Sequence, residues 1–298
     1  MCGIAGIINK EGMDVSGKLI EMLSLIQHRG RDASGIAVYG KGDEIFLRVA
    51  ISKPDLHELL LNLVTNYAGI LSERLYESDG RVRYSEMKLD IDDEAIPVLH
   101  RAINGIDGLY THSLGSGMTV YKENGPVSNL TGRHTIDYTP ATHGIAHVRM
   151  ATESAEDVNA AHPFISPFYS ELSLVHNGQF TNYYNVRRRL ESKGAQFKTL
   201  NDSEVASHLV AYAMMKNGGD LEEALNFALR ELDGIFCIIA STSKQLGYVR
   251  DKLGIKPLLL LQGGGLTLIG SEQIEFTAIY PDVYADEAEP GEVKVWKI

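Results

Sequence analysis

A cysteine at position 2 is the first residue of this 298-residue chain that could do covalent chemistry. If Met1 is removed, which is usual when the next side chain is small, Cys2 carries both a nucleophilic sulfur and a free α-amine. Because an α-amine has an ordinary pKa of about 7.7–8.0, it can act as a general base near neutral pH. The residue therefore predicts acyl transfer by an N-terminal thiol. The alternative is that Cys2 is only a small buried apolar residue.

Asn177 and Gly178 supply two hydrogen-bond donors that could stabilise an oxyanion. They follow an apolar run at 172–176 that is typical of a strand, and residues 181–189 have a helical pattern. An Asn-Gly pair after a strand usually forms a hairpin turn, but here no return strand follows. We therefore expect a turn that leaves the Asn177 amide and the Gly178 N–H free to face a developing negative charge.

Two charged residues could hold the ends of an amino-acid substrate. Arg149 lies near the end of an expected strand at 144–150, where a guanidinium can bind a carboxylate through two parallel hydrogen bonds. Asp202 opens an expected helix and could face a substrate ammonium. Both have structural alternatives, because Arg149 could pair with a neighbouring acid and residues 201–204 match a capping box.

Other polar segments point less clearly to chemistry. Residues 27–35, which include Arg29, form a donor-rich loop that could organise an anion or could be a salt-bridged turn. His143 and His147 have the spacing of a zinc pair, but no Glu lies between them and both fall in an expected strand, so we predict no metal. Cys237 lies in an apolar run and is expected in the core. Since no phosphate-loop or dinucleotide motif is present, we expect no cofactor in this chain.

The pattern of apolar residues predicts an α+β protein with stacked sheets, because strands dominate both ends of the chain and helices cluster between them. Residues from about 52 to 142 look like a mainly helical insertion, which could either bind a partner or complete the core. Further strands are expected at 35–39, 45–49, 235–241, 246–250, 257–261, 266–270 and 292–296, and helices at 14–26, 56–75, 95–109, 183–191, 202–215 and 221–232.

Composition excludes several classes of partner. A net charge of −11 argues against nucleic acid and against an anionic membrane surface. With only two cysteines a disulfide framework is not expected, and a reducing cytoplasm fits best. No apolar run approaches the length of a membrane span, and no secretory leader opens the sequence.

The ordered set of motifs resembles the class II glutamine amidotransferases, the N-terminal-nucleophile glutaminases. The resemblance runs along the whole chain apart from the segment at 52–142. The matching segments are Cys2-Gly3-Ile4, Gln27-His28-Arg29-Gly30, His147-Val148-Arg149 with Thr152, His176-Asn177-Gly178, Asp202-Ser203-Glu204-Val205, Leu232-Asp233-Gly234, Arg250-Asp251 with Gly254 and Pro257-Leu258, Ser271-Glu272, and Pro290-Gly291-Glu292.

The resemblance implies a four-layer αββα sandwich over residues 2–298, interrupted by the insertion. It also implies that Cys2 attacks the side-chain amide of glutamine to form a thioester. Asn177 and Gly178 would form the oxyanion hole, and Asp202 with the Gly178 backbone would hold the substrate ammonium. The substrate-binding residues implied by the matching motifs are Arg149, which would bind the α-carboxylate with help from Thr152, together with Asp202, Arg29 and His147.

Two departures from the family pattern lie near this site, since Arg31 and Met150 stand where many members have Gln and Tyr. Because no phosphoribosyl, sugar-isomerase or ATP-pyrophosphatase motif is visible, we expect a separate synthase subunit of the glutamate-synthase type to accept the ammonia. Any flavin or iron–sulfur cluster would belong to that subunit. Self-association is compatible with the sequence. The alternatives are a non-catalytic regulatory or scaffold relative, an amidophosphoribosyltransferase-like glutaminase, and another N-terminal-nucleophile amidohydrolase.

Overall fold

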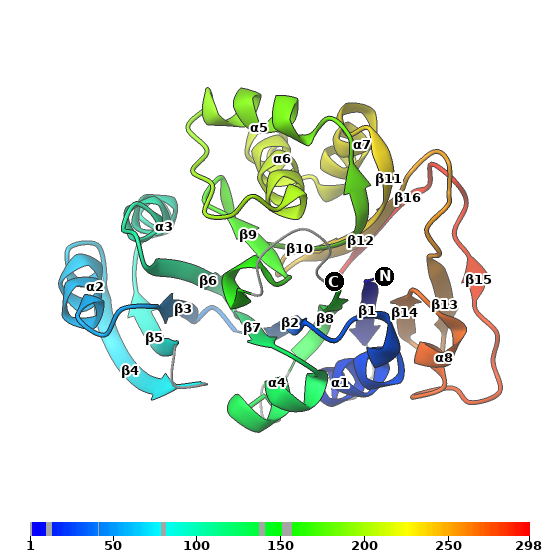
Figure 1. Cartoon of the computed structure of the whole chain (residues 1–298), viewed down its shortest axis with the longest axis horizontal. Helices are drawn as coiled ribbons and strands as arrows, with labels where there is room; N and C mark the ends of the chain where they lie inside the picture. Colours follow the sequence, from blue (N-terminus) through cyan, green and yellow to red (C-terminus); the bar gives the residue numbers. More distant parts are fainter. Residues whose placement is uncertain (1, 10–13, 41, 79–81, 137–140, 151–156) are drawn as a thin grey trace.

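Two stacked antiparallel sheets form the centre of the molecule in the computed structural model, which describes residues 2–9, 14–40, 42–78, 82–136, 141–150 and 157–298 (Figure 1). The larger sheet has the strand order β15 (Asp286–Glu287), β13 (Leu259–Gly263), β14 (Leu266–Gly270), β1 (Gly3–Asn9), β8 (Ala141–Arg149), β2 (Ala33–Gly40) and β7 (Met118–Asn124). The smaller sheet has the order β16 (Val293–Lys297), β12 (Gln245–Arg250), β11 (Gly234–Ser241), β10 (Tyr169–Phe180) and β9 (Phe164–Ser166).

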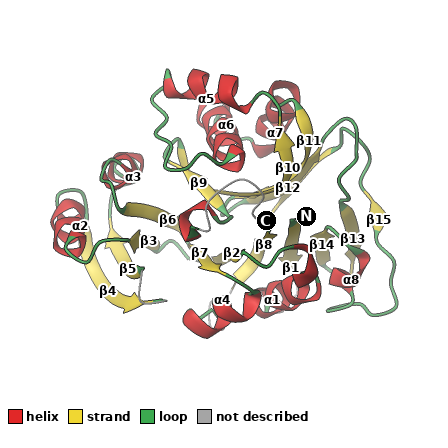
Figure 2. Cartoon of the chain, viewed as in Figure 1, coloured by secondary structure: helices red, strands yellow, loops and turns green. Residues whose placement is uncertain are grey.

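Helices cover the outer face of each sheet, so that Figure 2 shows strands between two helical layers. The strand β1 illustrates why, because all seven of its residues are buried. Its side chains alternate between two apolar cores: Ile4 and Ile8 face the other sheet, whereas Ala5 and Ile7 face helices. The predicted four-layer αββα sandwich is confirmed. The larger sheet is covered by α1 (Val15–Leu25), α4 (Val127–Arg133) and α8 (Gln273–Phe276), and the smaller by α5 (Tyr183–Glu191), α6 (Asp202–Asn217) and α7 (Leu221–Glu231).

The prediction of a mainly helical insertion at 52–142 is wrong, because four of the seven elements that the structure describes within it are strands. The expected helix at 56–75 ends at Thr65, and the chain beyond Gly69 pairs as a strand instead. Cross-strand pairing and sheet packing override the helical pattern of this charged stretch. A third sheet has the order β4 (Gly69–Glu77), β5 (Arg83–Asp90), β3 (Ile45–Ile51) and β6 (Leu109–Ser116), and α2 (Leu56–Thr65) and α3 (Ile96–Asn104) cover one of its faces.

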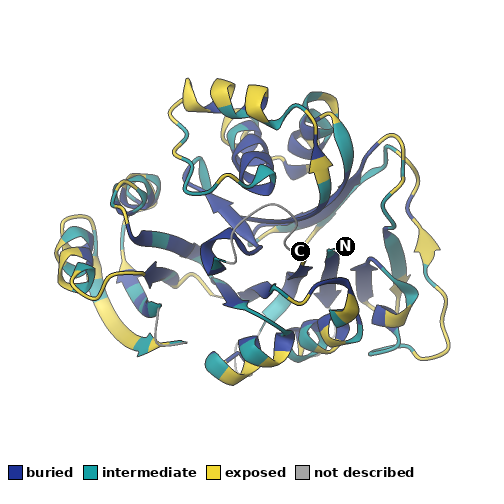
Figure 3. Ribbon diagram, viewed as in Figure 1, coloured by how far each residue is buried: buried dark blue, intermediate teal, exposed yellow. Residues whose placement is uncertain are grey.

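The insertion is joined to the main sandwich through β7, which lies at the edge of the seven-stranded sheet and pairs with β2 along its whole length. Figure 3 shows that the two central sheets are largely buried, whereas β4 at the far edge of the third sheet is exposed. Of the helices in the described ranges, none is both long and apolar enough to cross a bilayer.

Lys122 on β7 is a buried amine whose surroundings disfavour its charge. The residue is 3 % exposed and its ammonium lies 4.9 Å from the centre of the Phe164 ring. Burial is the main cause that lowers the pKa of Lys122 to about 7; the charge of Arg48 lowers it further, while Glu204 and Asp157 oppose the shift. Since the unfolded chain keeps this proton up to a higher pH, the free energy of unfolding should rise with pH above 7.

Lys122→Met is expected to stabilise the protein more at pH 7 than at pH 9. Between these values wild type gains up to about 2.7 kcal/mol from the lysine, because the folded state binds fewer protons there than the unfolded state. Methionine carries no proton, so its advantage should shrink by this amount over the interval. Urea unfolding at pH 7, 8 and 9 measures the difference, with the exposed Lys244→Met as control. If the free energies of unfolding of Lys122→Met and wild type changed with pH in the same way, the lowered pKa of Lys122 would be contradicted.

Candidate active site

Cys2 lies immediately before β1, in the middle of the larger sheet (Figure 1). The strand that follows is held on both sides, since β1 pairs with β8 and β14 and the Ile4 N–H donates to Ser271 Oγ at 2.9 Å. The thiol is partly exposed and its sulfur lies 3.8 Å from the Met150 carbonyl oxygen. Burial raises the pKa of the Cys2 thiol, against the opposing charges of Arg149 and Lys256. A thiol in this state needs a nearby base to become a nucleophile.

Arg29 fixes the position of Cys2. Its Nε donates to the Cys2 carbonyl oxygen at 2.9 Å, and its guanidinium pairs with Glu272 at 2.5 Å. His28 reaches the same carboxylate at 3.1 Å. Burial alone would raise the pKa of Glu272, but the hydrogen bonds and charges of Arg29 and His28 lower it below its ordinary value. The structure thus places Arg29 on the backbone of Cys2. It also adds Glu272, the residue that caps α8, whose role at this site is not apparent from the sequence.

For the glutaminase reaction that the sequence motifs lead us to expect, Glu272→Gln should lower kcat about tenfold and leave the KM for glutamine nearly unchanged. The amide holds Arg29 more weakly, so the Cys2 main chain is less well placed for attack. Steady-state kinetics on purified protein measure both constants. Glu21→Gln, which removes a surface ion pair with Lys18 on α1, is the matched control. A kcat equal to that of wild type would show that Glu272 does not position Cys2.

The predicted turn at Asn177 and Gly178 is wrong, because both residues lie inside β10, which continues to Phe180. They pair in register with Cys237 and Phe236 of β11. The Asn177 side chain is 2 % exposed, and its Nδ2 has no hydrogen-bond partner among the described residues. An unpaired buried amide donor costs stability, which favours a functional role for it.

The Gly178 N–H faces away from β11. Phe236, which lies opposite Gly178, uses both of its backbone groups on Asp251: its N–H donates to Oδ2 at 2.9 Å and its carbonyl accepts from the Asp251 N–H at 2.9 Å. Because backbone groups alternate along an antiparallel pair, the Gly178 N–H points to the opposite side of β10. On that side the Phe180 N–H, two residues further on, reaches Asp202 Oδ2 at 3.1 Å.

Only glycine fits at position 178. Its φ is +152°, and an added Cβ would lie 2.0 Å from the Ile235 carbonyl oxygen and 2.7 Å from the Phe236 Cα. These contacts are with backbone atoms that cannot move aside. A backbone N–H that points away from β11 and the Asn177 amide therefore follow each other on one strand, which is the donor pair expected for an oxyanion.

Asp202 is the first residue of α6, next to the end of β10. Asn201 caps this helix by accepting from the Ser203 N–H at 3.0 Å, as the sequence indicates. Glu204 does not close a capping box; its carboxylate accepts from Lys198 and Thr199. The Asp202 side chain remains 21 % exposed, so the carboxylate can reach a ligand while it holds the Phe180 N–H.

His147 and Arg149 lie on β8 and take up different places. His147 is fully buried between the sheets, where its Nε2 lies 3.2 Å from the His176 carbonyl oxygen and its ring centre lies 3.9 Å from that of His162. Burial holds the pKa of His147 well below its usual range. Arg149 is 4 % exposed at the end of the strand, and its backbone packs so closely on Gly30 that a Cβ at Gly30 would lie 2.5 Å away. Thr152 lies outside the described residues.

These contacts bring the two halves of the site together. Ile4 pairs with His147 across β1 and β8, and His147 reaches the strand that carries Asn177. Strand alternation places Cys2 on the same side as Ile4, toward the smaller sheet. Cys237 lies instead in the core between the sheets, fully buried. Within the described part of the chain, no group of three His, Cys, Asp or Glu residues is arranged to hold a metal ion.

Comparison with known proteins supports the chemistry of this site. The model of the glutamine amidotransferase domain family matches residues 147–278. The glutamine amidotransferase-like protein GlxB of Rhizobium meliloti is 33 % identical over 304 residues, covering 99 % of this chain and 98 % of its own. A Methanothermobacter thermautotrophicus protein, whose name also assigns it to the glutamine amidotransferases, is 32 % identical over 307 residues and covers both chains completely.

A solved structure described as the allosteric regulatory enzyme of purine biosynthesis has the same fold. It superposes with a TM-score of 0.64 at 20 % sequence identity, over 99 % of this chain and 46 % of its own. This likeness establishes the fold, and the full-length relatives establish the family. The chain belongs to the class II glutamine amidotransferases.

Proposed function

We propose that this chain is a glutaminase that hydrolyses the side-chain amide of glutamine through a Cys2 thioester and delivers the ammonia to a separate synthase subunit. The observation that carries the proposal is the unpaired Nδ2 of buried Asn177, on a strand that His147 joins to β8 beside Cys2. A thiol and an oxyanion donor pair in one place are the parts that acyl transfer from an amide requires.

The reaction begins with attack of the Cys2 sulfur on the amide carbon of glutamine. The α-amine of Cys2, freed by removal of Met1, takes the thiol proton, and the oxyanion binds the Asn177 amide and the Gly178 N–H. The carbon–nitrogen bond then breaks as that proton passes to the leaving nitrogen, which departs as ammonia. Water hydrolyses the thioester and releases glutamate, with the oxyanion again held by the same donors.

Substrate binding falls to charged groups on either side of the thiol. Arg149 at the end of β8 binds the α-carboxylate, because a guanidinium matches a carboxylate in a two-bond geometry. Asp202 at the start of α6 binds the α-ammonium with its exposed edge. Thr152 assists Arg149. Arg29 positions Cys2 through the hydrogen bond to its carbonyl oxygen. His147 positions the strand that carries Asn177 through its contact with the His176 carbonyl oxygen.

The experiment for the glutaminase activity combines mass and product analysis. Purified protein should lack the mass of one methionine residue and should form glutamate and ammonia from glutamine in equal amounts. N-acetylglutamine, which lacks the α-ammonium, should react much more slowly. A processed protein that forms no glutamate would instead support a regulatory or scaffold role, and equal rates on both substrates would support a broader amidohydrolase.

The lengths of two relatives support the proposal of a separate synthase partner, because this chain matches both over nearly their full lengths. We propose that it resembles the ammonia-accepting subunit of glutamate synthases. Purification of the natively expressed, tagged protein should recover a second chain that raises the rate of glutamine hydrolysis in the presence of its own acceptor substrate. A protein that purifies alone, and whose activity no extract fraction changes, would contradict this.

A further inference from the structure

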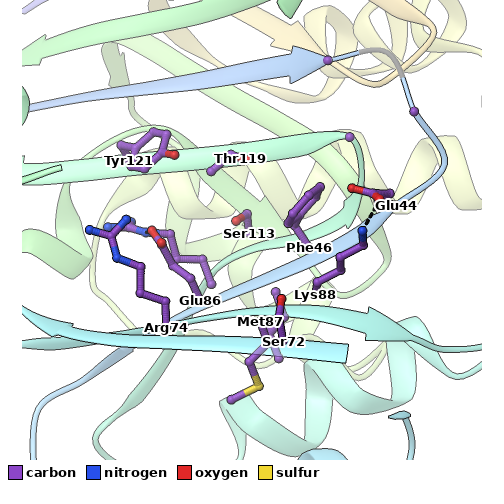
Figure 4. A pocket seen from close by; sticks show the side chains of 15 residues that line it. Glu44, Phe46, Ser72, Arg74, Glu86, Met87, Lys88, Ser113, Thr119 and Tyr121 are labelled. Atoms are coloured by element: carbon purple, nitrogen blue, oxygen red, sulfur yellow. Dashed lines mark hydrogen bonds and ion pairs between the residues drawn. The ribbon is translucent and has the colours of Figure 1, made fainter. Parts of the chain in front are cut away.

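A cavity of about 440 Å³ lies in the insertion, where its four-stranded sheet meets the edge of the main sandwich at β7. Its size is that of sites for small organic ligands. None of its lining residues belongs to the candidate active site. Figure 4 shows side chains from both sheets pointing into it, with Phe46 and Arg74 from one sheet and Thr119 and Tyr121 from the other.

The charged residues that line this cavity are not all joined in ion pairs. Glu86 pairs with Arg48 at 3.0 Å, and Glu44 pairs with Lys88. Arg74 has no ion pair with any residue that the structure describes; its guanidinium carbon lies 5.0 Å from the centre of the Tyr76 ring. Glu86 lies opposite Arg74 on β5 but pairs with Arg48, so the cavity lining carries one more cation than anions, which favours an anionic ligand.

A buried polar group lacks a partner at the same place. Ser113 lines the cavity and is fully buried, yet its Oγ has no hydrogen-bond partner within the described ranges. The rings of Phe46 and Tyr121, from β3 and β7, provide the apolar surface against which a flat ligand body can pack.

We propose that this cavity binds a small organic anion with an aromatic body. Its carboxylate or phosphate pairs with Arg74, and its ring packs on Phe46 and Tyr121. Because the guanidinium presents a two-bond geometry to either oxyanion, both kinds of acid group fit the same position. This site is independent of the proposed glutaminase reaction.

Matched charged and neutral ligands test the proposal. Ligand-observed NMR measures binding of 3-phenylpropionate, benzoate and phenyl phosphate, with 3-phenylpropanamide and benzamide as neutral counterparts. At least one of the acids should bind with a Kd below about 10 mM. A carboxylate that binds should do so more tightly than the corresponding amide, and phenyl phosphate, if it binds, should do so more tightly than both amides. The carboxylates and the phosphate as separate arms show which acid group is preferred. Binding of no acid, or equal binding of acids and amides, would overturn the proposal.

Two variants locate the site. Arg74→Gln should weaken acid binding about fivefold or more, since it removes the counter-charge. The matched control Arg83→Gln changes the net charge equally, on a residue of β5 that pairs with Glu77 outside the cavity, and should bind like wild type. Thr119→Phe, at a half-buried position, fills the cavity and should abolish binding while thermal melting confirms the fold. Binding unchanged in both Arg74→Gln and Thr119→Phe would overturn the assignment.

Discussion

Replacement of Cys2 by serine is expected to lower the glutaminase kcat by about 10³-fold or more, with no loss of folding. The hydroxyl is a far weaker nucleophile at neutral pH than a thiol beside its own amine. The fold should persist, because β1 is held by its pairing with β8 and β14 and by Ser271, not by the Cys2 side chain. Glutamate release, normalised to folded protein by circular dichroism, gives the ratio.

The second cysteine provides the control for this experiment. Cys237 is fully buried in the core between the sheets, and burial raises the pKa of its thiol to about 12. Cys237→Ala should therefore cost stability through lost packing but keep kcat per folded molecule. Alkylation by iodoacetamide should label Cys2 alone, and glutamine should slow it. If Cys2→Ser hydrolyses glutamine as fast as wild type, Cys2 is not the nucleophile.

Asn177→Ala is expected to lower kcat by about 10²–10³-fold with little change in stability. In the resting protein the Nδ2 of Asn177 has no partner in the described structure, so its loss removes an unsatisfied group and not a structural bond. The KM for glutamine should change much less, because the donor acts on the oxyanion that forms during attack. Single-turnover formation of the thioester and urea unfolding measure the two effects.

Asn159 gives the opposite expectation and so serves as the contrast. Its side chain is buried and fully bonded, to His112 at 3.0 Å and to Asp157 at 2.9 Å. Asn159→Ala should therefore lower the free energy of unfolding by about 1–3 kcal/mol. Its kcat per folded molecule should stay near that of wild type. The reverse outcome, with Asn177→Ala unstable but active, would make Asn177 a structural residue.

The sequence predicts the sandwich well because its strands carry apolar residues on both faces. The run at 144–150 is an example, and β8 ends at Arg149 as expected. The second half of the helix expected at 56–75 is wrong, because this charged segment pairs with β5 as a strand. That pairing leaves no signal in the local pattern of residues. The turn at Asn177 fails for a related reason. The Asn-Gly pair favours a turn, but hydrogen-bonded pairing with β11 continues the strand β10 past these two residues.

The sequence nominates candidate site residues, but it does not predict the contacts that they make. Motif order singles out Cys2, Arg149, Asn177 and Asp202. The link from Arg29 to the Cys2 carbonyl joins segments that no periodicity relates. The same holds for the contact of His147 with the His176 carbonyl, which depends on how two sheets stack.

The direction of the Gly178 N–H depends on a residue that lies on the other side of β11. Asp251 holds both backbone groups of Phe236, and this fixes which members of β11 turn toward β10. A shift of the ladder by one residue would reverse every donor along it. The direction of the proposed oxyanion donor therefore depends on the register of β10 and β11, and the Asp251 carboxylate supports this register from the side of β11 that faces away from β10. We therefore expect substitutions at Asp251 to lower activity by changing the geometry of β10 and β11.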